Sequence, residues 1–353
     1  MQPLVSVLID TYNHERFIEQ AIISVLEQDL PPAEMEILVV DDGSTDRTPE
    51  IVRKFAPRVR YLRKANGGQA SAFNAGIPET RGEIVAMLDG DDWWVRQKLR
   101  RQLETLAANP EIGIVGHGHF EADADGRTYG AVFPGISGRL DLSSLASARR
   151  FSMLRGFFGT TKMAIRRWVL DRILPVPEEL VIEADEYIFT LAPALAPAFL
   201  LNEALFYYRF HGGNLFQTAV YDEPRVRRKG QVLASLAGHL PARLAEFGVP
   251  TDVSDALLEP LRMDAARSRL SLDGGSPWET FQVESALYRI NYQSMTLGYH
   301  AFRVLALSLA LILPPRWFYR FRRWYAASGL SNARTLVAQA APSEAVVEIR
   351  QGN

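Results

Sequence analysis

The chain has 353 residues, of which 47% are hydrophobic, so it can bury one large core or two ordinary ones. The absence of cysteine excludes disulfides and thiolate metal sites, leaves any metal to carboxylate or imidazole ligands, and makes a reducing cytoplasm the simplest compartment. With 39 basic and 41 acidic residues the formal charge is -2, which gives no overall electrostatic case for binding nucleic acid.

The first ninety residues alternate short apolar runs with helix-period segments, which predicts a mostly parallel sheet flanked by helices. Because the first apolar run has no basic region before it and no cleavage site, we interpret it as a strand and do not expect secretion. The predicted strands are Leu4 to Ile9, Glu36 to Val40, Val59 to Leu62 and Ile84 to Leu88. The predicted helices are Ile18 to Leu26, closed by Pro31-Pro32, and a segment carrying Ile51, Val52 and Phe55.

The pattern is looser after residue 112. We expect a strand at Ile112 to Val115, a turn-rich irregular region from Gly126 to Gly138, a helix at Asp185 to Leu191 and a strand at Ala204 to Phe210. Ala, Leu and Arg then recur at helical spacing. The prediction is an α/β domain over residues 1–215, a helical region over 216–300 and an amphipathic, basic and aromatic tail over 301–353.

Acidic residues follow several of the predicted strands. Asp10, Asp41-Asp42 and Asp89-Gly90-Asp91-Asp92 stand where parallel strands end, and that edge of an open α/β sheet is where ligands bind. Carboxylates this close repel one another, and a divalent cation is the usual remedy. The plain alternative is a solvated turn with helix caps.

Four segments taken together resemble glycosyltransferase family 2, whose members have the GT-A fold. They are residues 5–13, 37–46, 66–68 with 74–76, and 88–92. The order and spacing match over residues 4 to about 100, more thinly to about 215, and hardly beyond. Asp10 departs from the family, which more often has proline there, and could contact the nucleotide or cap the strand.

The resemblance implies a donor site for a nucleotide sugar. It puts Thr11, Tyr12 and Asn13 against the nucleoside, and Asp42 or Asp41 as the acceptor of a hydrogen bond from the uracil imide. The nucleotide side of the cleft would be lined by Asn66, Gly67, Gly68 and Asn74, although Asn-Gly-Gly alone more often marks a turn.

The resemblance also implies a metal site. Asp89 and Asp91 match the D-x-D motif, which holds ribose and a Mg²⁺ or Mn²⁺ that bridges the donor's two phosphates, with Gly90 beside the donor. Asp91 is the first choice of metal ligand. His211 is either a further ligand or a structural loop histidine, Asp92 supports the site or holds sugar hydroxyls, and His117 and His119 are not expected to take part.

The implied catalytic base lies in Glu183-Ala184-Asp185-Glu186. An inverting transfer needs a carboxylate to take the acceptor's proton. Asp185 fits the family's late acidic motif most plausibly, Glu186 is a close second and Glu183 third. The alternative is that these are helix-start carboxylates favoured by the helix dipole.

The predicted function is therefore an inverting glycosyltransferase. It would move a hexose-type sugar from a UDP-sugar, or another NDP-sugar, to a saccharide or lipid-linked saccharide in bacterial cell-surface polysaccharide synthesis. A retaining GT-A enzyme and a non-catalytic nucleotide-sugar-binding protein are the alternatives. A sugar nucleotidylyltransferase is disfavoured, because Tyr12 to Arg16 does not resemble its glycine-rich loop.

The C-terminal part suggests a membrane partner. Residues 316–325 interleave arginines and aromatic rings, which predicts contact with an anionic membrane through residues 301–325. A helix packed on the catalytic domain is the alternative, and no nucleic acid partner is expected. The run Val304 to Leu313 would reach only about 15 Å as a helix, half a hydrocarbon core. We expect a cytoplasmic protein, peripheral on the inner face of the membrane.

Overall fold

The computed structural model describes residues 3–214, 222–290 and 297–327. The chain divides into two compact units, Met1–Arg262 and Met263–Asn353, and the division falls inside helix α9 (Thr251–Leu272). The three-part division expected from composition stays a prediction, and its first boundary lies at a residue outside the described ones.

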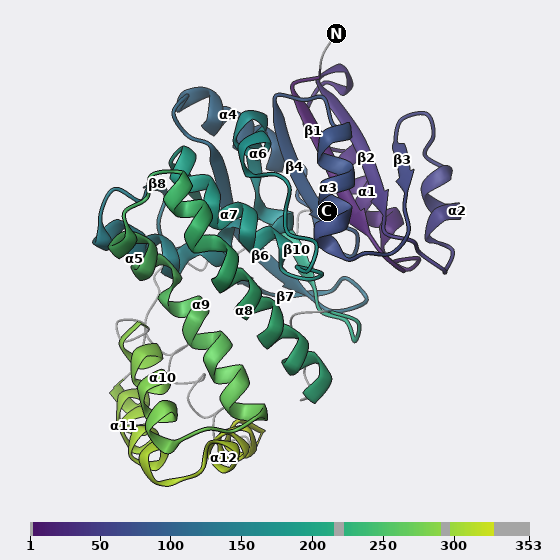
Figure 1. The fold of residues 1–353 in the computed structure, drawn as a ribbon. Helices are drawn as coiled ribbons and strands as arrows, with labels where there is room; N and C mark the ends of the chain where they lie inside the picture. Colours follow the sequence, from purple (N-terminus) through teal and green to yellow (C-terminus); the bar gives the residue numbers. More distant parts are fainter. Residues whose placement is uncertain (1–2, 215–221, 291–296, 328–353) are drawn as a thin grey trace. The chain divides into compact units, whose positions relative to one another are not determined.

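One sheet organises the first unit (Figure 1). Within the described residues it runs in the order β3-β2-β1-β4-β9-β6-β10-β5, with β7 added to β6 and β8 added to β10. The strands are β1 (Val5–Thr11), β2 (Met35–Asp41), β3 (Arg60–Arg63), β4 (Ile84–Asp89), β5 (Trp93–Trp94), β6 (Ile114–Ala122), β7 (Thr128–Val132), β8 (Gly138–Leu140), β9 (Ala164–Arg166) and β10 (Ala198–Arg209).

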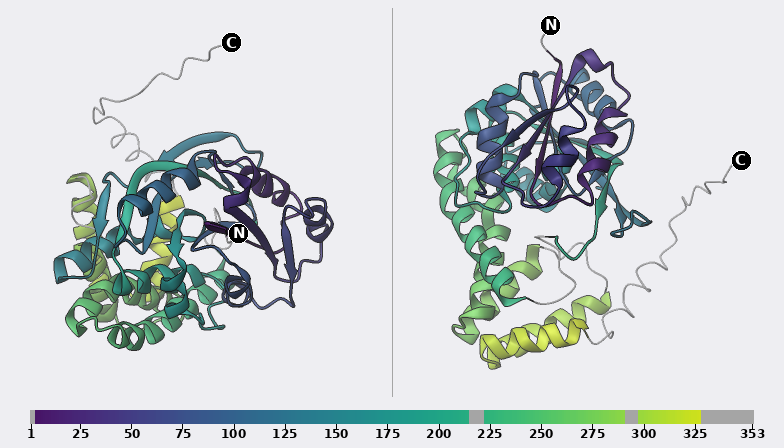
Figure 2. Two further views of the ribbon diagram at one scale, coloured as in Figure 1. Left: turned by 90° about the horizontal axis from the view of Figure 1, so that it is seen from above. Right: turned by 90° about the vertical axis from the view of Figure 1, so that its right-hand side faces the viewer.

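Helices cover both faces of the central parallel strands β1, β2 and β4, and these strands are mostly apolar and buried, whereas the edge strand β3 is only partly buried. On one face, alternate residues of β1, β2 and β4 pack with α1 (Ile18–Leu26), α2 (Thr48–Arg53) and α4 (Lys98–Ala108) in one buried cluster. On the other face lies α3 (Gln69–Gly76). A Cβ at Gly76 would stand only 2.8 Å from Leu8 Cδ1, so glycine allows this close packing. Figure 2 gives two further views of these layers.

The sheet becomes mixed beyond β4. β9 is antiparallel to both β4 and β6, while β6 and β10 are parallel to each other. Two reversals therefore leave β10 running in the same direction as β1 and β4. The carboxyl ends of β1, β2, β4 and β10 meet at one edge, although β10 follows β4 by more than a hundred residues.

Helices complete the first unit and form most of the second. The remaining helices of the first unit are α5 (Leu145–Leu154), α6 (Arg167–Ile173), α7 (Ala184–Leu195) and α8 (Glu223–Glu246). The second unit contains the end of α9, then α10 (Pro277–Ile290), α11 (Leu297–Ile312) and α12 (Pro315–Ala327) around a small core of its own. The predicted α/β fold with a helical C-terminal region is confirmed. Among the described helices, none combines the length and the apolar character needed to cross a bilayer.

Candidate active site

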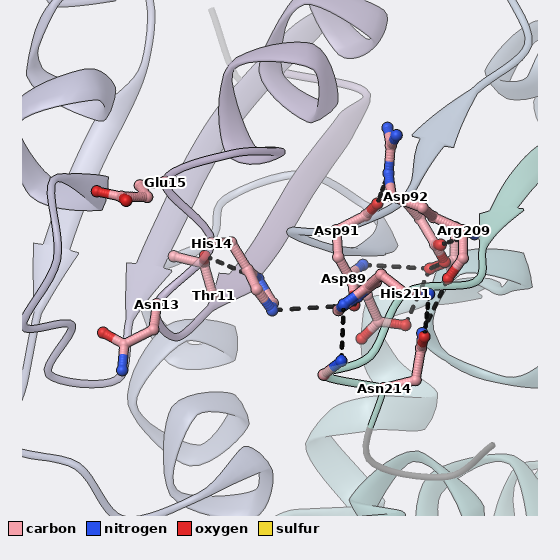
Figure 3. A network of polar contacts seen from close by, with 12 residues as sticks. Thr11, Asn13, His14, Glu15, Asp89, Asp91, Asp92, Arg209, His211 and Asn214 are labelled. Carbon is pink, nitrogen blue, oxygen red and sulfur yellow. Dashed lines mark hydrogen bonds and ion pairs between the residues drawn. The ribbon is translucent and has the colours of Figure 1, made fainter. Parts of the chain in front are cut away.

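The polar residues that follow β1, β4 and β10 form one network at the carboxyl edge of the sheet (Figure 3). The backbone brings the strand ends very close, because Gly90 N donates to Asp10 O at 2.9 Å. A Cβ at Gly90 would lie 2.7 Å from Thr11 Oγ1 and 2.9 Å from His14 Nδ1. Only glycine therefore lets the loop after β4 pass beside the loop after β1.

Asp91 is the centre of this network. His211 Nε2 lies 2.9 Å from Asp91 Oδ2, and His14 Nε2 lies 3.9 Å from the same oxygen. His14 is oriented by Thr11, whose Oγ1 is 3.2 Å from His14 Nδ1. Two imidazoles and one carboxylate thus converge from three strand ends. His14 was not singled out from the sequence, although it stands three residues after Thr11.

Arg209 and Thr161 hold the rest of the acidic loop. The Arg209 backbone N–H donates to Asp92 Oδ1 at 3.0 Å, and its Nε donates to the Asp91 carbonyl at 2.8 Å. Thr161 Oγ1 lies 3.0 Å from Asp89 Oδ2 and 2.9 Å from Asp92 Oδ2, so its one proton is shared between them. Asp92 is buried and fully engaged, which makes it a support of the loop.

The crowding of carboxylates shifts their pKa values in different directions. Burial, together with the charge of Asp91, raises the pKa of Asp10 to about 8. Burial and neighbouring carboxylates also raise the pKa of Asp89 and of Asp92. Burial opposes ionisation of Asp91 too, but His14 and His211 outweigh it and lower its pKa. The raised pKa values show that the buried carboxyl groups disfavour one another's ionisation. Asp10 Oδ1 is buried without a hydrogen-bond partner.

The donor set fits a divalent cation that shares its ligands with a substrate. In the described part of the chain no three His, Asp or Glu side chains form a complete metal-binding group. Mg²⁺ commonly uses one or two carboxylates and completes its shell with phosphate oxygens and water. The predicted ligands Asp91, Asp89 and His211 are of the chemical types that such a cation accepts, and their role as ligands stays a prediction. Gly213 N donates to His211 Nδ1 at 3.2 Å, so ligation through Nε2 requires the other tautomer and the loss of this bond.

The loop after β2 is built around Asp41 and Asp42. Asp42 accepts hydrogen bonds from Lys64 Nζ at 2.7 Å, Gly67 N at 3.0 Å and Gly68 N at 2.7 Å. Asp41 accepts from Ser44 N at 2.7 Å and from the Tyr61 hydroxyl. Both carboxylates are buried and bonded to the protein. The expected uracil contact therefore stays a prediction, with the immediate role of both residues being to shape this loop.

Of the other residues predicted to bind the sugar donor, some are exposed and some hydrogen-bond to the protein. Tyr12 and Asn13 are exposed, and Asn13, at a left-handed φ of 57°, accepts a hydrogen bond from Thr45 N at 2.8 Å. Asn66 Nδ2 donates to the Asp42 carbonyl at 3.0 Å. Asn74 is tied to Val176 by two hydrogen bonds of 2.7 and 2.8 Å, so its amide joins α3 to the segment before α7.

Asp185 stands at the start of α7 with its carboxylate held by donors. Thr160 N and Thr160 Oγ1 lie 2.8 and 3.0 Å from Asp185 Oδ2, and Glu186 N lies 2.9 Å from Oδ1. Burial nevertheless raises its pKa, and its charge contributes to the raised pKa of Asp10 and Asp89. Asp185 is therefore close to the acidic network.

Glu186 and Glu183, the other predicted candidates for the base, have surroundings that differ from those of Asp185. Arg155 Nε donates to Glu186 Oε1 at 2.8 Å, which commits Glu186 to an ion pair. Glu183 adopts a left-handed φ of 56°, and both its carboxylate oxygens are buried without a hydrogen-bond partner, with Lys229 Nζ 3.9 Å away. Burial, reinforced by Glu186, raises its pKa to about 8.

Two further residues near the site, Gln69 and Lys162, carried no signal in the sequence. Gln69, the first residue of α3, donates to Thr160 Oγ1 at 3.1 Å and accepts from Ala184 N at 2.9 Å. Lys162 lies among the acidic residues, and burial lowers its pKa to about 8 against the opposing charges of Asp92 and Asp185. Their relevance depends on the fold, since α3, residues 160–162 and α7 are far apart in sequence.

Solved structures share this fold. S. aureus TarS 1–349, solved with UDP-GlcNAc, aligns at a TM-score of 0.59 and 20% identity over 83% of each chain. The mannosyltransferase PcManGT of Pyrobaculum calidifontis, solved with GDP-Man and Mn²⁺, aligns at a TM-score of 0.54 and 22% identity, covering 94% of this chain and 88% of that one. These likenesses show that the chain has the GT-A fold.

Sequence comparison gives the family. The family model described as "Glycosyl transferase family 2" matches residues 6–172 of this chain. The uncharacterized glycosyltransferase alr2836 of Nostoc sp. is 34% identical over 232 residues, 64% of this chain and 71% of that protein. TuaG of Bacillus subtilis, named for teichuronic acid biosynthesis, is 42% identical over 110 residues, so the match spans 30% of this chain and only 42% of TuaG. The chain belongs to glycosyltransferase family 2.

Proposed function

We propose that this glycosyltransferase is an inverting enzyme in which Asp185 is the catalytic base. The observation that carries the proposal is the held carboxylate of Asp185, with hydrogen bonds from Thr160 and Glu186, beside the acidic network at the same edge. Asp185 would take the proton of the acceptor hydroxyl as that oxygen attacks the anomeric carbon. Glu186 is the second candidate, but its ion pair with Arg155 weakens it as a base.

We further propose that turnover needs Mg²⁺ or Mn²⁺ held by Asp91, with Asp89 and His211 as neighbouring ligands. Such a cation would neutralise charge on the diphosphate that leaves. The geometry that supports this is the convergence on Asp91, with His211 Nε2 2.9 Å and His14 Nε2 3.9 Å from Asp91 Oδ2. The Mn²⁺ in the PcManGT complex supports this reading.

The proposed donor is a UDP-hexose, or another NDP-sugar, and the proposed acceptor is a saccharide or lipid-linked saccharide. The UDP-GlcNAc bound to TarS supports a UDP-sugar as donor, and the GDP-Man bound to PcManGT supports a GDP-sugar as the alternative. TuaG supports a role in bacterial cell-surface polysaccharide synthesis. A cysteine-free chain is compatible with the cytoplasm, where we propose that it acts.

The test is release of nucleoside diphosphate from a panel of UDP-, GDP- and dTDP-sugars with Mn²⁺, Mg²⁺ or EDTA. We expect slow, metal-dependent release from one donor. Asp91→Ala should abolish that release. Asp185→Asn should spare UDP binding in calorimetry and lower transfer by about a thousandfold, within the range found for a missing base. Equal loss of UDP binding in both variants would contradict the division of roles.

The stereochemistry of the product separates the remaining alternatives. An inverted anomeric configuration, observed by NMR on the first product formed, is expected. A retained configuration would assign a retaining GT-A mechanism. UDP binding with no turnover of any donor or acceptor would instead indicate a nucleotide-sugar-binding protein.

A further inference from the structure

Helix α11 of the second unit turns a face of large aliphatic side chains to solvent. Val304 is 57% exposed, Leu305 60% and Ile312 74%, and Leu311 joins them. Their positions, with Ser308 between them, follow i, i+1, i+4, i+7 and i+8, so they share one helix face. The opposite face carries Ala306 and Ala310, which lie in the core of the unit. Soluble surfaces rarely expose a contiguous aliphatic stripe of this kind.

Helix α12 adds aromatic rings and arginines. Trp317 is 65% exposed and Trp324 60%, and with Phe321 they form an i, i+4, i+7 stripe. Arg316 and Arg320 are exposed beside that stripe. Phe318 and Tyr319 of the same helix point inward and are buried in the core of the unit, and the half-buried Tyr325 stacks on Phe302 of α11. Inward and outward rings are therefore separate sets. Figure 2 shows both helices at the yellow end of its colour scale.

One buried carboxylate fixes which faces point outward. Glu284 of α10 is buried, and its Oε2 lies 2.7 Å from Arg322 Nη1 of α12 and 3.3 Å from Arg303 Nη1 of α11. Neither helix can rotate its apolar stripe into the core without separating a charge from this carboxylate. The exposed stripes are therefore held in place by the fold.

The positive charge of α11 and α12 favours an anionic partner. Residues 297–327 contain five arginines and no acidic residue, which leaves 34 basic against 41 acidic residues for the rest of the chain. Arg303 and Arg322 are occupied by the buried Glu284, whereas Arg316 and Arg320 are exposed. A second copy docked through the same face would bring Arg316 and Arg320 against their own counterparts, because a twofold interface pairs a surface with itself. An anionic surface with an apolar interior satisfies both features of the face.

We propose that the outward faces of α11 and α12 bind an anionic lipid membrane. The aliphatic face of α11 enters the acyl boundary, Trp317 and Trp324 lie at headgroup depth, and Arg316 and Arg320 contact lipid phosphates. α11 lies in the plane of the interface, because its 16 residues are too few to span a bilayer. This surface goes beyond the proposed catalytic function and does not depend on it.

The experiment is co-sedimentation of the full chain with vesicles of phosphatidylcholine containing phosphatidylglycerol, against phosphatidylcholine alone. We expect binding to the anionic vesicles to be about tenfold stronger and to weaken as salt rises. The double variants Leu305→Gln/Ile312→Gln and Arg316→Gln/Arg320→Gln should each lower binding about tenfold or more.

Matched substitutions in α10 are the controls. Trp278→Gln removes an equally exposed tryptophan, and Arg289→Gln removes an exposed arginine. Both should leave vesicle binding unchanged, and all variants should keep the helical circular dichroism and the nucleoside diphosphate release of the parent. Equal sedimentation with neutral vesicles, no sedimentation with either, or an equal loss in the α10 controls would overturn the proposal. So would a concentration-dependent dimer that disappears in the double variants while vesicle binding persists.

Discussion

Asp91 and Asp185 are both buried, and the groups that contact their carboxylates shift their pKa values in opposite directions. Burial works against ionisation at both Asp91 and Asp185. At Asp91 two histidines reverse the effect and lower the pKa. At Asp185 the neutral hydrogen-bond donors of Thr160 and Glu186 only partly offset the effect of burial, so the pKa of Asp185 stays raised. A raised pKa moves a general base toward the pH at which it works.

Glu183 is the strained residue of the site. A left-handed conformation costs a non-glycine residue roughly 1–2 kcal/mol, and Glu183 adopts φ 56° directly before α7. Its carboxylate is buried, and burial, followed by the charge of Glu186, raises its pKa from 4.5 to about 8. The bend sets the first turn of α7, which carries Asp185.

The ionisation of Glu183 should make stability depend on pH. Because its folded pKa exceeds its unfolded pKa, the folded state binds the extra proton, and stability falls as pH rises from 4.5 to about 8. Glu183→Gln keeps the shape without the charge. We expect the variant to be more stable than the parent by a few kcal/mol, on the order of the linkage value, at about pH 9, and nearly equal to it at about pH 4.

Urea unfolding of the first unit at the two pH values measures this effect. Glu178→Gln, which changes an exposed glutamate five positions earlier, is the control, and its free energy of unfolding should differ from that of the parent by the same small amount at both pH values. A shift of the urea midpoint in Glu183→Gln that is the same at both pH values would refute the assignment.

At the scale of elements, the contact between the ends of β1 and β4 aligns the site. A Cβ in Gly90→Ala would meet Thr11 Oγ1 at 2.7 Å and His14 Nδ1 at 2.9 Å, so the loop that carries Asp89 and Asp91 must move. We expect donor turnover to fall about tenfold or more, since small displacements at a reacting centre are costly. The free energy of unfolding should fall by about 1–3 kcal/mol, the usual cost of overpacking.

Gly156→Ala is the matched control for this contact. A Cβ at Gly156 meets open space within 4 Å, so both activity and stability should stay near those of the parent. Donor hydrolysis and urea unfolding measure the two effects. Full activity in Gly90→Ala would mean that the strand ends adjust without disturbing Asp91.

Helices and strands whose apolar residues recur with a clear helix or strand period were predictable from the sequence. The helix Ile18–Leu26 has the predicted bounds, and the four strands of the parallel part lie within two residues of theirs. β9 (Ala164–Arg166) was not predicted, because three residues carry no measurable period and their pairing with β4 and β6 is non-local. That strand is where the parallel part of the sheet ends and the mixed part begins.

The site was predictable only where residues sit at strand ends. Asp89, Asp91 and His211 come together because β4 and β10 end at one edge. The burial of Asp41 could not be foreseen, since its partner Tyr61 comes from β3. Gln69 likewise joins Thr160 to the start of α7 only through the tertiary fold. Whether these residues act as proposed in catalysis stays a prediction.

At the scale of the whole molecule, the second unit is organised around a charged centre. Glu284 of α10 contacts Arg267 of α9 at 3.1 Å as well as Arg303 of α11 and Arg322 of α12. Burial opposes its ionisation, but the three arginines lower its pKa. One carboxylate therefore joins four helices whose apolar core is small. Such a cluster specifies how the helices pack more than it adds net stability.

Glu284→Gln should loosen the second unit while leaving the first intact. The substitution leaves three arginines around a neutral amide, and breaking a buried ion pair from one side typically costs about 3–5 kcal/mol. Amide hydrogen exchange should therefore speed up across α10, α11 and α12 and stay unchanged in β1, β2 and β4. Glu279→Gln, on the same helix but at an exposed pair with Arg269, is the control and should change neither set. Faster exchange in both units would mean that they unfold together, and unchanged exchange in α10 to α12 would mean that apolar packing alone holds these helices.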